Sequence, residues 1–294
     1  MNSVFKKIGL ISKPDADEIS PTIQALTGLL TQLSITVYID RETARHITVP
    51  SEQILATDEL ADYCDLIMSV GGDGTLLSSA RALVNKDIPL IGINLGRLGF
   101  LVDISPDEMS IKIKQILEGH YLEEERIILN TKIIRDEAVI FEQAAFNEVA
   151  LHRLKSPGLI DIETYVNDNF LNSQRSDGLI IATPTGSTAY ALSGGGPLMH
   201  PSLDAIVLVP INPHTLTNRP IVVDGKSHIG IKFSQRDKHK AQLTCDNVIL
   251  PDILEGDFIS IKRHANKIRL LHPTDHDFFK TLRVKLDWSR APQS

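Results

Sequence analysis

The chain has 294 residues, enough for about two domains, and 42% of them are hydrophobic, enough for a sizeable core in each domain. The formal net charge of -7 argues against a broad surface for nucleic acid or for an anionic membrane. Cys64 and Cys245 lie far apart without metal-ligand spacing, so we expect buried free thiols in a cytoplasmic protein. The longest apolar stretch, Ala205–Ile211, is too short to span a membrane.

The first 120 residues alternate short apolar runs with amphipathic stretches, which is typical of an α/β domain. Strands are predicted at residues 7–12, 35–39, 66–70 and 89–93. The last two are continuous apolar runs, as in strands buried on both faces of a parallel sheet. Helices are predicted from an N-cap at Ser20 with Pro21 at the first position, over residues 75–84, and from a capping box at residues 105–108 to Gly119. We therefore expect an open parallel sheet with helices.

After about residue 121 the sequence changes to short strands separated by turns. Residues 159–166 alternate in hydropathy and lead into turn residues before Phe170, which predicts a hairpin. Residues 258–263 and 267–271 predict a second hairpin around residues 265–266. Closely spaced hairpins indicate a β-rich, sandwich-like domain.

The last segment, residues 276–288, carries Phe279, Leu282 and Leu286 at helical spacing, so we expect a helix that packs back on the N-terminal domain. The predicted organisation is an α/β domain over residues 1–120, a β-rich domain over residues 121–270 and a returning C-terminal segment over residues 271–294.

Glycine marks two regions of the chain. Eleven of the eighteen glycines fall within residues 71–99 and 178–196, where even spacing would place about three. Glycine is needed where the backbone takes positive φ or approaches a ligand closely. The two clusters therefore indicate two backbone-built pieces of one or two sites.

The first cluster, Gly-Gly-Asp-Gly-Thr at residues 71–75, follows a predicted buried strand and precedes a predicted helix. At such a position, backbone N–H groups and the positive end of the helix can hold phosphate oxygens. A carboxylate there repels phosphate unless it binds a metal or accepts a proton from an attacking hydroxyl, both of which phosphoryl transfer requires. A tight turn with Asp73 as the helix N-cap explains this motif alone equally well.

The second cluster begins with Thr-Pro-Thr-Gly-Ser-Thr-Ala-Tyr at residues 183–190, again after an apolar strand. Four hydroxyls on permissive backbone form a polar cradle that can bind phosphate, ribose or adenine, and Tyr190 can stack on a ring. A capped turn is the alternative interpretation.

Other patterns argue against further chemistry. The motifs of Walker ATPases, Rossmann dehydrogenases and α/β-hydrolases are absent from the sequence. Residues 232–240 carry basic side chains without aromatic ones, which favours a solvated hairpin loop over a nucleic-acid surface. His272 and His276 have the spacing of a metal pair on a helix, but Pro273 interrupts that helix, so capping or packing is predicted for both.

Several separated motifs, taken together and in this order, resemble those of the bacterial ATP-NAD kinases. They are residues 71–75, residues 92–101, Asn147-Glu148, residues 175–178, residues 183–190, and residues 213–216 with Arg219-Pro220. The resemblance extends over nearly the whole chain. It is far more specific than Gly-Gly-Asp-Gly alone, which phosphofructokinases and diacylglycerol or sphingosine kinases share.

The resemblance implies transfer of the γ-phosphoryl group of ATP to the 2′-hydroxyl of the adenosine ribose of NAD, giving NADP, with Mg²⁺ bound through the phosphates. It makes Asp73 the general base or a metal-positioning carboxylate. The nucleotide-binding positions that it implies are Gly72, Asp73, Gly74, Phe100, Asn147, Glu148, Arg175, Asp177, Thr188, Ala189, Tyr190, Ala191, Leu192, Ser193 and Asn247.

The family also implies separate roles for these residues. Asn147 and Glu148 would hold NAD hydroxyls, and Asp177 would lie near the nicotinamide end. Residues 188–193 would line the adenosine and the phosphates. Arg175 would reach the site of a neighbouring subunit in a homodimer or homotetramer.

Two alternatives remain at this point. One is a lipid or sugar kinase that shares Gly-Gly-Asp-Gly, and the other is a non-enzymatic protein that senses NADP or NADPH with the same cradles but no base. The sequence also leaves open whether ATP or polyphosphate is the donor, whether NADH is phosphorylated, and whether NADPH or NADH inhibits.

Overall fold

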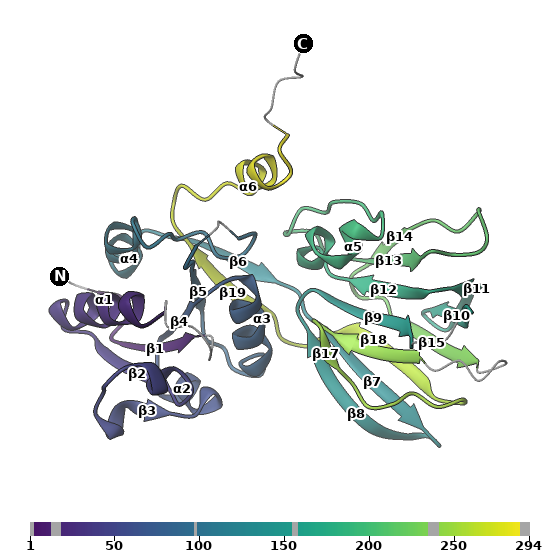
Figure 1. Cartoon of the computed structure of the whole chain (residues 1–294), viewed down its shortest axis with the longest axis horizontal. Helices are drawn as coiled ribbons and strands as arrows, with labels where there is room; N and C mark the ends of the chain where they lie inside the picture. The colour runs from purple at the N-terminus through teal and green to yellow at the C-terminus, as the bar shows by residue number, and fades with distance from the viewer. Residues whose placement is uncertain (1–2, 13–18, 97–98, 155–157, 235–240, 289–294) are drawn as a thin grey trace, which may run out of the picture. The chain divides into compact units, whose positions relative to one another are not determined.

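The computed structural model describes residues 3–12, 19–96, 99–154, 158–234 and 241–288 (Figure 1). Three sequence features lie partly outside these residues: residues 97–98 of the 92–101 motif, residues 235–240 of the basic segment, and residues 289–294 of the C-terminal segment. The chain divides into two compact units. Unit 1 comprises Met1–Glu125 with Ile268–Ser294, and unit 2 comprises Arg126–Lys267.

Unit 1 is built on a seven-stranded sheet. Its strands are β1 (Lys7–Ser12), β2 (Thr36–Asp40), β3 (Ile54–Leu55), β4 (Leu66–Val70), β5 (Leu90–Ile93), β6 (Leu122–Arg126) and β19 (Ile268–His272), in the order β3-β2-β1-β4-β5-β19-β6. From β3 to β19 the neighbours pair in parallel. The prediction of an open parallel sheet is confirmed.

Helices cover both faces of this sheet (Figure 1). They are α1 (Ile19–Gln32), α2 (Thr57–Tyr63), α3 (Asp73–Ala82) and α4 (Met109–Leu117), with short 3₁₀ turns η1 (Thr43–His46) and η2 (Ser51–Gln53). Buried Ile8 and Leu10 of β1 share one core with α1 and α4, whereas a Cβ at Gly9 would meet Leu60 of α2 on the opposite face. This alternation follows from the period of two in a strand.

Three predicted helix starts are wrong. Helix α1 already includes Ile19, so Ser20 and Pro21 lie inside its first turn. Residues 105–108 form a turn, in which Ser105 Oγ donates to the Glu108 carboxylate at 3.1 Å, and α4 begins only at Met109. Helix α3 begins at Asp73, two residues earlier than predicted, with Gly72 at the N-cap. In each case the capping residue types are present, but their side chains bond elsewhere or lie inside the helix.

Unit 2 consists of two six-stranded antiparallel sheets. The first has the order β11-β10-β15-β18-β7-β8, and its strands are β7 (Leu129–Arg135), β8 (Ala138–Ala145), β10 (Ile160–Val166), β11 (Asn169–Ser176), β15 (Ile229–Ser234) and β18 (Phe258–Arg263). The second has the order β14-β13-β12-β9-β16-β17, and its strands are β9 (Glu148–Arg153), β12 (Gly178–Ala182), β13 (Ala205–Ile211), β14 (Ile221–Asp224), β16 (Ala241–Cys245) and β17 (Val248–Ile249). Buried aliphatic side chains from both sheets form one core, so the predicted β-rich, sandwich-like fold is confirmed.

One predicted hairpin is confirmed and the other is wrong. Strands β10 and β11 pair across a two-residue turn at Asn167 and Asp168, whose φ angles of 50° and 64° suit such turns. Strand β18 pairs with β15 and β7 in unit 2, whereas β19 lies beside β5 in unit 1. Ile268, Leu270 and Leu271 of β19 are all buried. This burial fits a strand with covered faces better than the arm of a half-exposed hairpin.

The C-terminal helix α6 (Phe278–Lys285) groups with unit 1, as expected. Asp277 caps it by accepting from the Phe279 N–H at 2.9 Å. Leu282 is buried, but Phe279 is 56% exposed, so the apolar face differs from the predicted one.

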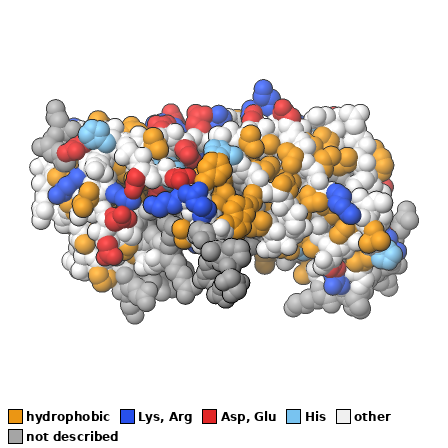
Figure 2. Space-filling model, turned by 90° about the horizontal axis from the view of Figure 1, so that it is seen from above, with side chains coloured by type: hydrophobic (Ala, Val, Ile, Leu, Met, Phe, Trp, Pro, Cys, Tyr) orange, Lys and Arg blue, Asp and Glu red, His pale blue; other side chains and the backbone are white. Residues whose placement is uncertain are grey.

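The remaining composition-based expectations concern thiols and surface charge. Cys64 and Cys245 are buried thiols that form no disulfide, as predicted, and burial raises the pKa of Cys64 to about 12. On the face drawn in Figure 2, Lys and Arg side chains lie among Asp and Glu side chains. Within the described ranges, no helix combines the length and apolar character that crossing a membrane requires.

The turn between β7 and β8 gives a test of the backbone assignment. Asp136 and Glu137 have φ angles of 49° and 64°, a left-handed conformation that costs energy for non-glycine residues. Glu137→Gly should therefore raise the free energy of unfolding by about 0.5–1 kcal/mol, measured by urea denaturation. The control Gln143→Gly, inside β8, should lower it. Destabilisation by Glu137→Gly would contradict the assigned turn.

Candidate active site

Asp73 lies where β4 passes into α3, and its carboxylate is held by backbone amides of a distant segment. Oδ2 accepts from the N–H of Phe100 at 2.9 Å, and Oδ1 accepts from the N–H groups of Leu101 and Val102 at 3.0 and 3.2 Å. A Cβ at Gly99 would come within 2.1 Å of Asp73 Oδ1. Glycine at position 99 is therefore required for this segment to close on the carboxylate.

These bonds leave Asp73 with one acceptor position. An ionised carboxylate offers roughly four lone-pair sites, two on each oxygen. The amides occupy both sites of Oδ1 and one site of Oδ2. Asp73 is half-buried, while Gly72 and Gly74 are exposed beside it. The remaining site on Oδ2 can accept the proton of a hydroxyl that enters this exposed position.

A pocket of about 570 Å³ opens beside the motif within unit 1. Its lining includes Ser12, Asp40, Gly72, Gly74, Thr75 and Ser78. The exposed N-terminal end of α3 contributes glycine backbone and hydroxyl groups to it, the kind of surroundings that bind phosphate oxygens. Asp40 is already engaged, since it accepts from the Thr57 hydroxyl and from the amides of Glu42 and Thr43.

In unit 2, Asp246 repeats the arrangement of Asp73. Its Oδ2 accepts from the Phe146 N–H at 2.7 Å, and its Oδ1 accepts from the N–H groups of Asn147 and Glu148 at 2.7 and 3.1 Å. Asp246 is buried in the turn between β16 and β17. Sequence reasoning missed this residue. The available sequence signal was the dipeptide Asp246-Asn247, a residue pair typical of turns. In the structure the two residues have φ angles of 45° and 66° and form a two-residue turn.

The second glycine cluster packs directly on the Asn147-Glu148 segment. The Thr183 hydroxyl donates to the Phe146 carbonyl at 2.7 Å and accepts from the Gly186 N–H at 3.1 Å. A Cβ at Gly186 would lie 2.1 Å from the Asn147 carbonyl oxygen. The Asn147-Glu148 motif and the motif that begins at Thr183 therefore form one surface of unit 2, although 36 positions separate Asn147 from Thr183.

Glu148 has an unusual environment on this surface. Its side chain is buried, Oε2 has no hydrogen-bond partner among the described residues, and the backbone amide of Tyr190 donates to the carboxylate. Burial and the negative charge of Asp246 raise the pKa of Glu148 to about 7. Near neutral pH this group can therefore donate as well as accept a hydrogen bond.

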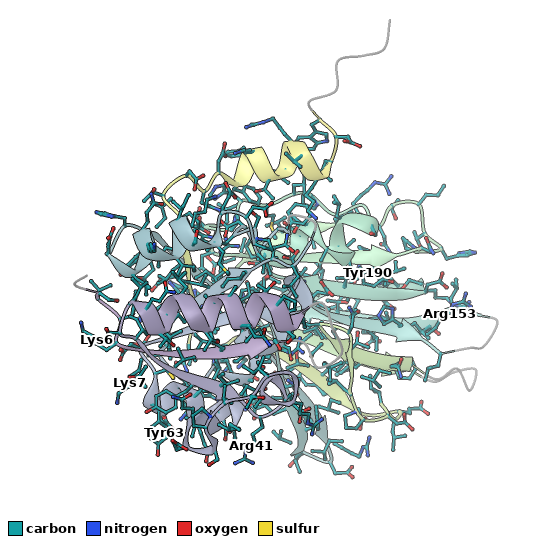
Figure 3. All side chains as sticks on the ribbon, turned by 60° about the vertical axis from the view of Figure 1, so that its left-hand side comes forward. Lys6, Lys7, Arg41, Tyr63, Arg153 and Tyr190 are labelled. Atoms are coloured by element: carbon teal, nitrogen blue, oxygen red, sulfur yellow. The ribbon has the colours of Figure 1, made fainter. Side chains whose placement is uncertain are left out.

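Tyr190 and Asp177 complete the polar surface. Tyr190 is 36% exposed and stacks on His152, with ring centroids 5.4 Å apart. Burial lowers the pKa of His152, so its ring is neutral at pH 7. The Tyr190 pKa is raised by burial and by the nearby charges of Glu148 and Asp177. Asp177 pairs with Arg153 Nε at 2.6 Å. Figure 3 labels Tyr190 and Arg153, both on unit 2.

The other expected positions are distributed as follows. Thr188 ends the 3₁₀ turn η3 (Thr185–Thr188), and residues 190–193 form α5 (Tyr190–Ser193) after Ala189. Ala191 is fully buried, so it offers no exposed atom to a ligand. Arg175 is exposed and pairs with Asp161 at 3.3 Å. Asn247 is exposed in its turn, and Phe100 lies in unit 1 beneath Lys285 Nζ at 5.7 Å.

The described side chains offer one group of three with the spacing of metal ligands, Asp103, His272 and His276 in unit 1. This group does not include Asp73, three of whose acceptor sites are taken by amides. A divalent cation at the Gly-Gly-Asp-Gly motif therefore depends on ligand oxygens, such as those of phosphates.

Comparison with known proteins identifies the family. Residues 8–121 match the ATP-NAD kinase N-terminal domain, and residues 146–272 match the ATP-NAD kinase C-terminal domain. The chain belongs to the ATP-NAD kinase family. It is 46% identical over 287 residues to the NAD kinase of Saccharophagus degradans, with 98% of each chain covered. It is 48% identical over 296 residues to that of Methylococcus capsulatus, with 98% of this chain and 99% of the relative covered.

Solved structures of ATP-NAD kinase relatives share the fold. A yeast NADH kinase complexed with NADH superposes with a TM-score of 0.90 at 24% identity, covering 100% of this chain and 91% of the other. An NAD kinase from Archaeoglobus fulgidus in complex with ATP superposes with a TM-score of 0.74 at 26% identity, covering 96% and 98%.

The raised pKa of Glu148 predicts a pH dependence of stability. A carboxyl with a pKa of 4.5 when unfolded and about 7 when folded stabilises the native state below pH 4.5, and this contribution is lost as the pH rises through 7. Glutamine does not titrate, so the Glu148→Gln variant should not lose this stability as the pH rises. Relative to the wild type, the variant should gain about 3 kcal/mol of unfolding free energy between pH 4 and pH 8.

Urea unfolding at several pH values measures this difference. Glu52→Gln, at an exposed position, is the matched control and should follow the wild type. If the unfolding free energy of Glu148→Gln changed with pH in the same way as that of the wild type, the fold would not hold Glu148 in its neutral form.

Proposed function

We propose that this chain is an NAD kinase, which transfers the γ-phosphoryl group of ATP to the 2′-hydroxyl of the adenosine ribose of NAD and releases NADP and ADP. The observation that carries the proposal is the Asp73 carboxylate, held by three amides at the start of α3 with one acceptor position left on Oδ2. Membership of the ATP-NAD kinase family supports the choice of substrates.

In this reaction Asp73 serves as general base. A ribose hydroxyl is a poor nucleophile near pH 7, and a carboxylate within hydrogen-bond reach accepts its proton as the oxygen attacks the γ-phosphorus. The new bond joins the 2′-oxygen to phosphorus, and the bond from the γ-phosphorus to the bridging oxygen breaks, so ADP leaves. The three amides fix the orientation of the carboxylate before the substrate arrives.

The donor phosphates occupy the pocket beside the Gly-Gly-Asp-Gly motif in unit 1. Backbone N–H groups and the N-terminal end of α3 supply positive partial charge there without lysine side chains. Mg²⁺ accompanying ATP would be held through phosphate oxygens and would supply the remaining positive charge. This assignment explains how a chain with a net charge of -7 binds a polyphosphate.

The dinucleotide binds on unit 2. Asn147 and Glu148 hold ribose hydroxyls, since adjacent carboxamide and carboxyl groups can bond a vicinal diol and align one oxygen. Tyr190, supported by His152, stacks on a base, and residues 188–193 line the adenosine and phosphates. Asp177 lies toward the nicotinamide, and Asn247 contributes a contact on unit 2. Gly72, Gly74 and Phe100 contribute nucleotide contacts on unit 1.

The assembly and the cellular location are part of the same proposal. We infer a cytoplasmic homodimer or homotetramer in which Arg175, which is exposed on β11, reaches the site of a neighbouring subunit. A light-scattering mass tests the oligomer, and Arg175→Ala should then raise KM for NAD without changing the mass.

A panel of acceptors tests the function. Purified chain, γ-labelled ATP and Mg²⁺ are incubated with NAD, NADH, a diacylglycerol or fructose 6-phosphate, and polyphosphate replaces ATP in a parallel series. Label should pass to NAD. Transfer to the lipid or the sugar instead, or binding of NADP without any transfer from either donor, would overturn the proposal in favour of the other classes.

Asp73→Asn tests the base. The variant should lose about 10²–10⁴-fold in kcat, because it cannot accept the proton, while calorimetry should find NAD binding changed only a few-fold. The matched control is Asp65→Asn in the same unit, where the carboxylate also accepts two amides, those of Lys6 and Lys7, away from the motif. A near-normal rate of NADP formation by the Asp73→Asn variant would exclude Asp73 as the general base.

A further inference from the structure

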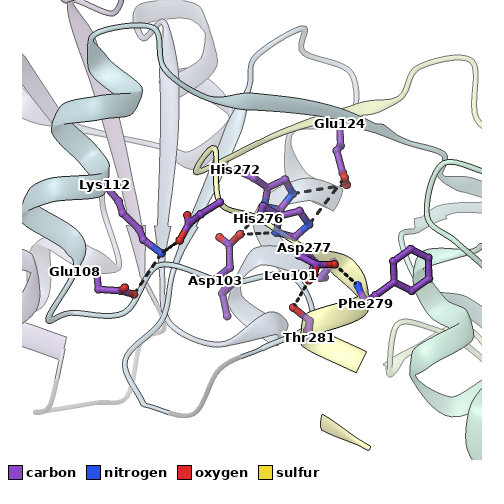
Figure 4. Close-up of polar contacts among 12 residues, drawn as sticks. Leu101, Asp103, Glu108, Lys112, Glu124, His272, His276, Asp277, Phe279 and Thr281 are labelled. Carbon is purple, nitrogen blue, oxygen red and sulfur yellow. Dashed lines mark hydrogen bonds and ion pairs between the residues drawn. The ribbon is translucent and has the colours of Figure 1, made fainter. Parts of the chain in front are cut away.

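Two histidines and two carboxylates meet inside unit 1, and none of them belongs to the Gly-Gly-Asp-Gly motif (Figure 4). Asp103 follows the segment that binds Asp73, Glu124 lies on β6, His272 ends β19, and His276 precedes α6. The two imidazole rings stack with centroids 4.0 Å apart and planes at 23°. Their side chains are only 2% and 6% exposed.

Asp103 contacts both imidazole rings, in each case at the Nδ1 atom. Its Oδ2 lies 3.0 Å from Nδ1 of His272 and 2.7 Å from Nδ1 of His276. An ionised carboxylate only accepts hydrogen bonds, so each Nδ1 carries the proton. In a neutral imidazole this leaves a lone pair on Nε2. A carboxylate on the far nitrogen of a histidine is also the usual arrangement behind a metal-binding imidazole.

Both Nε2 atoms are buried, and neither has a hydrogen-bond partner among the described residues. They face the Glu124 carboxylate, with His272 Nε2 at 3.8 Å from Oε2 and His276 Nε2 at 3.9 Å from Oε1. These separations are too long for hydrogen bonds. They are close to the spacing of ligands around one ion, because two atoms each about 2.0–2.2 Å from Zn²⁺ lie roughly 3.3–4 Å apart.

We propose that His272 Nε2, His276 Nε2 and a carboxylate oxygen of Glu124 bind a transition-metal ion, for which Zn²⁺ is the best-fitting probe, and that Asp103 orients the two imidazoles. Two histidines and one glutamate form a known zinc ligand set, with a fourth position for water. The Glu124 side chain is 31% exposed, so solvent reaches this side of the cluster.

The ligand types distinguish this site from the Mg²⁺ that accompanies ATP. Mg²⁺ prefers oxygen ligands and keeps several waters, whereas imidazole nitrogen suits zinc, copper, nickel and iron. A simple charge network of protonated histidines fits less well, since two stacked imidazolium rings would repel each other at 4.0 Å.

The local chain explains why sequence reasoning rejected this pair. Pro273 interrupts the helix that would place residues four apart on one face, but the rings meet without such a helix. His272 belongs to a strand, and a turn closed by the His276 N–H donating to the Pro273 carbonyl at 3.0 Å stacks the second ring on the first.

The site is also connected to the Asp73 anchor. Asp103 directly follows Leu101 and Val102, whose amides donate to Asp73. An ion on the two histidines would tie residues 101–103, β6, β19 and the start of α6 together. Metal binding should therefore stabilise unit 1 and restrict the segment that positions the carboxylate.

Calorimetry with untagged, chelator-treated chain and Zn²⁺, without nucleotide, tests the proposal. One tight site per chain and a raised melting temperature are expected, and Co²⁺ in place of Zn²⁺ should give visible absorption bands. Asp103→Asn should weaken binding about 10–100-fold, as loss of a carboxylate behind a ligating histidine does elsewhere. Glu124→Gln and His276→Gln should weaken it at least as much.

Controls separate this site from adventitious surface binding. Glu125→Gln, on the neighbouring exposed position of β6, and His120→Asn, at an exposed histidine, should keep the full affinity and the Co²⁺ spectrum. Circular dichroism checks that each variant folds, and Glu124→Gln alters only a partly exposed side chain. Absence of a stoichiometric site in the wild type, or equal binding by Glu124→Gln, His276→Gln and the controls, would overturn the proposal.

Discussion

In each unit of this protein, one aspartate accepts hydrogen bonds from the backbone N–H groups of three successive residues and so fixes that segment. Asp73 holds residues 100–102 in unit 1, and Asp246 holds residues 146–148 in unit 2. Hydrogen bonds to a charged acceptor contribute about 1.5–3 kcal/mol each, more than neutral ones. The two anchors therefore fix backbone that would otherwise be free to move, and the groups proposed to bind and react are attached to that backbone.

The glycine clusters follow from these anchors. At Gly99 and Gly186 a Cβ would come within 2.1 Å of Asp73 Oδ1 and of the Asn147 carbonyl oxygen, so no other residue allows the two segments to close. Backbone amides are then the main source of positive partial charge. Such a site needs few lysines, and this reconciles the net charge of -7 with polyphosphate substrates.

Local sequence patterns predicted much of the fold, whereas the pairing of strands into sheets and the hydrogen-bond partners of site residues became clear only in the structure. Continuous apolar runs identified β4 and β5, and the turn residues Asn167 and Asp168 identified a hairpin. The strands β18 and β19 were predicted correctly, but hydropathy does not state which sheet a strand joins. For the site, motifs indicated Asp73 and Glu148. Asp246 escaped notice because its role depends on contacts about 100 positions away in the sequence.

The proposed reaction joins two groups, the adenosine 2′-hydroxyl of NAD and the γ-phosphorus of ATP. The most direct measurement is the position of the phosphate in the product formed from NAD, ATP and Mg²⁺, determined by proton–phosphorus correlation NMR of the purified dinucleotide. We expect a phosphomonoester coupled to the 2′-proton of the adenosine ribose. A phosphate on another hydroxyl, or a dinucleotide that emerges unphosphorylated while ATP is consumed, would contradict it.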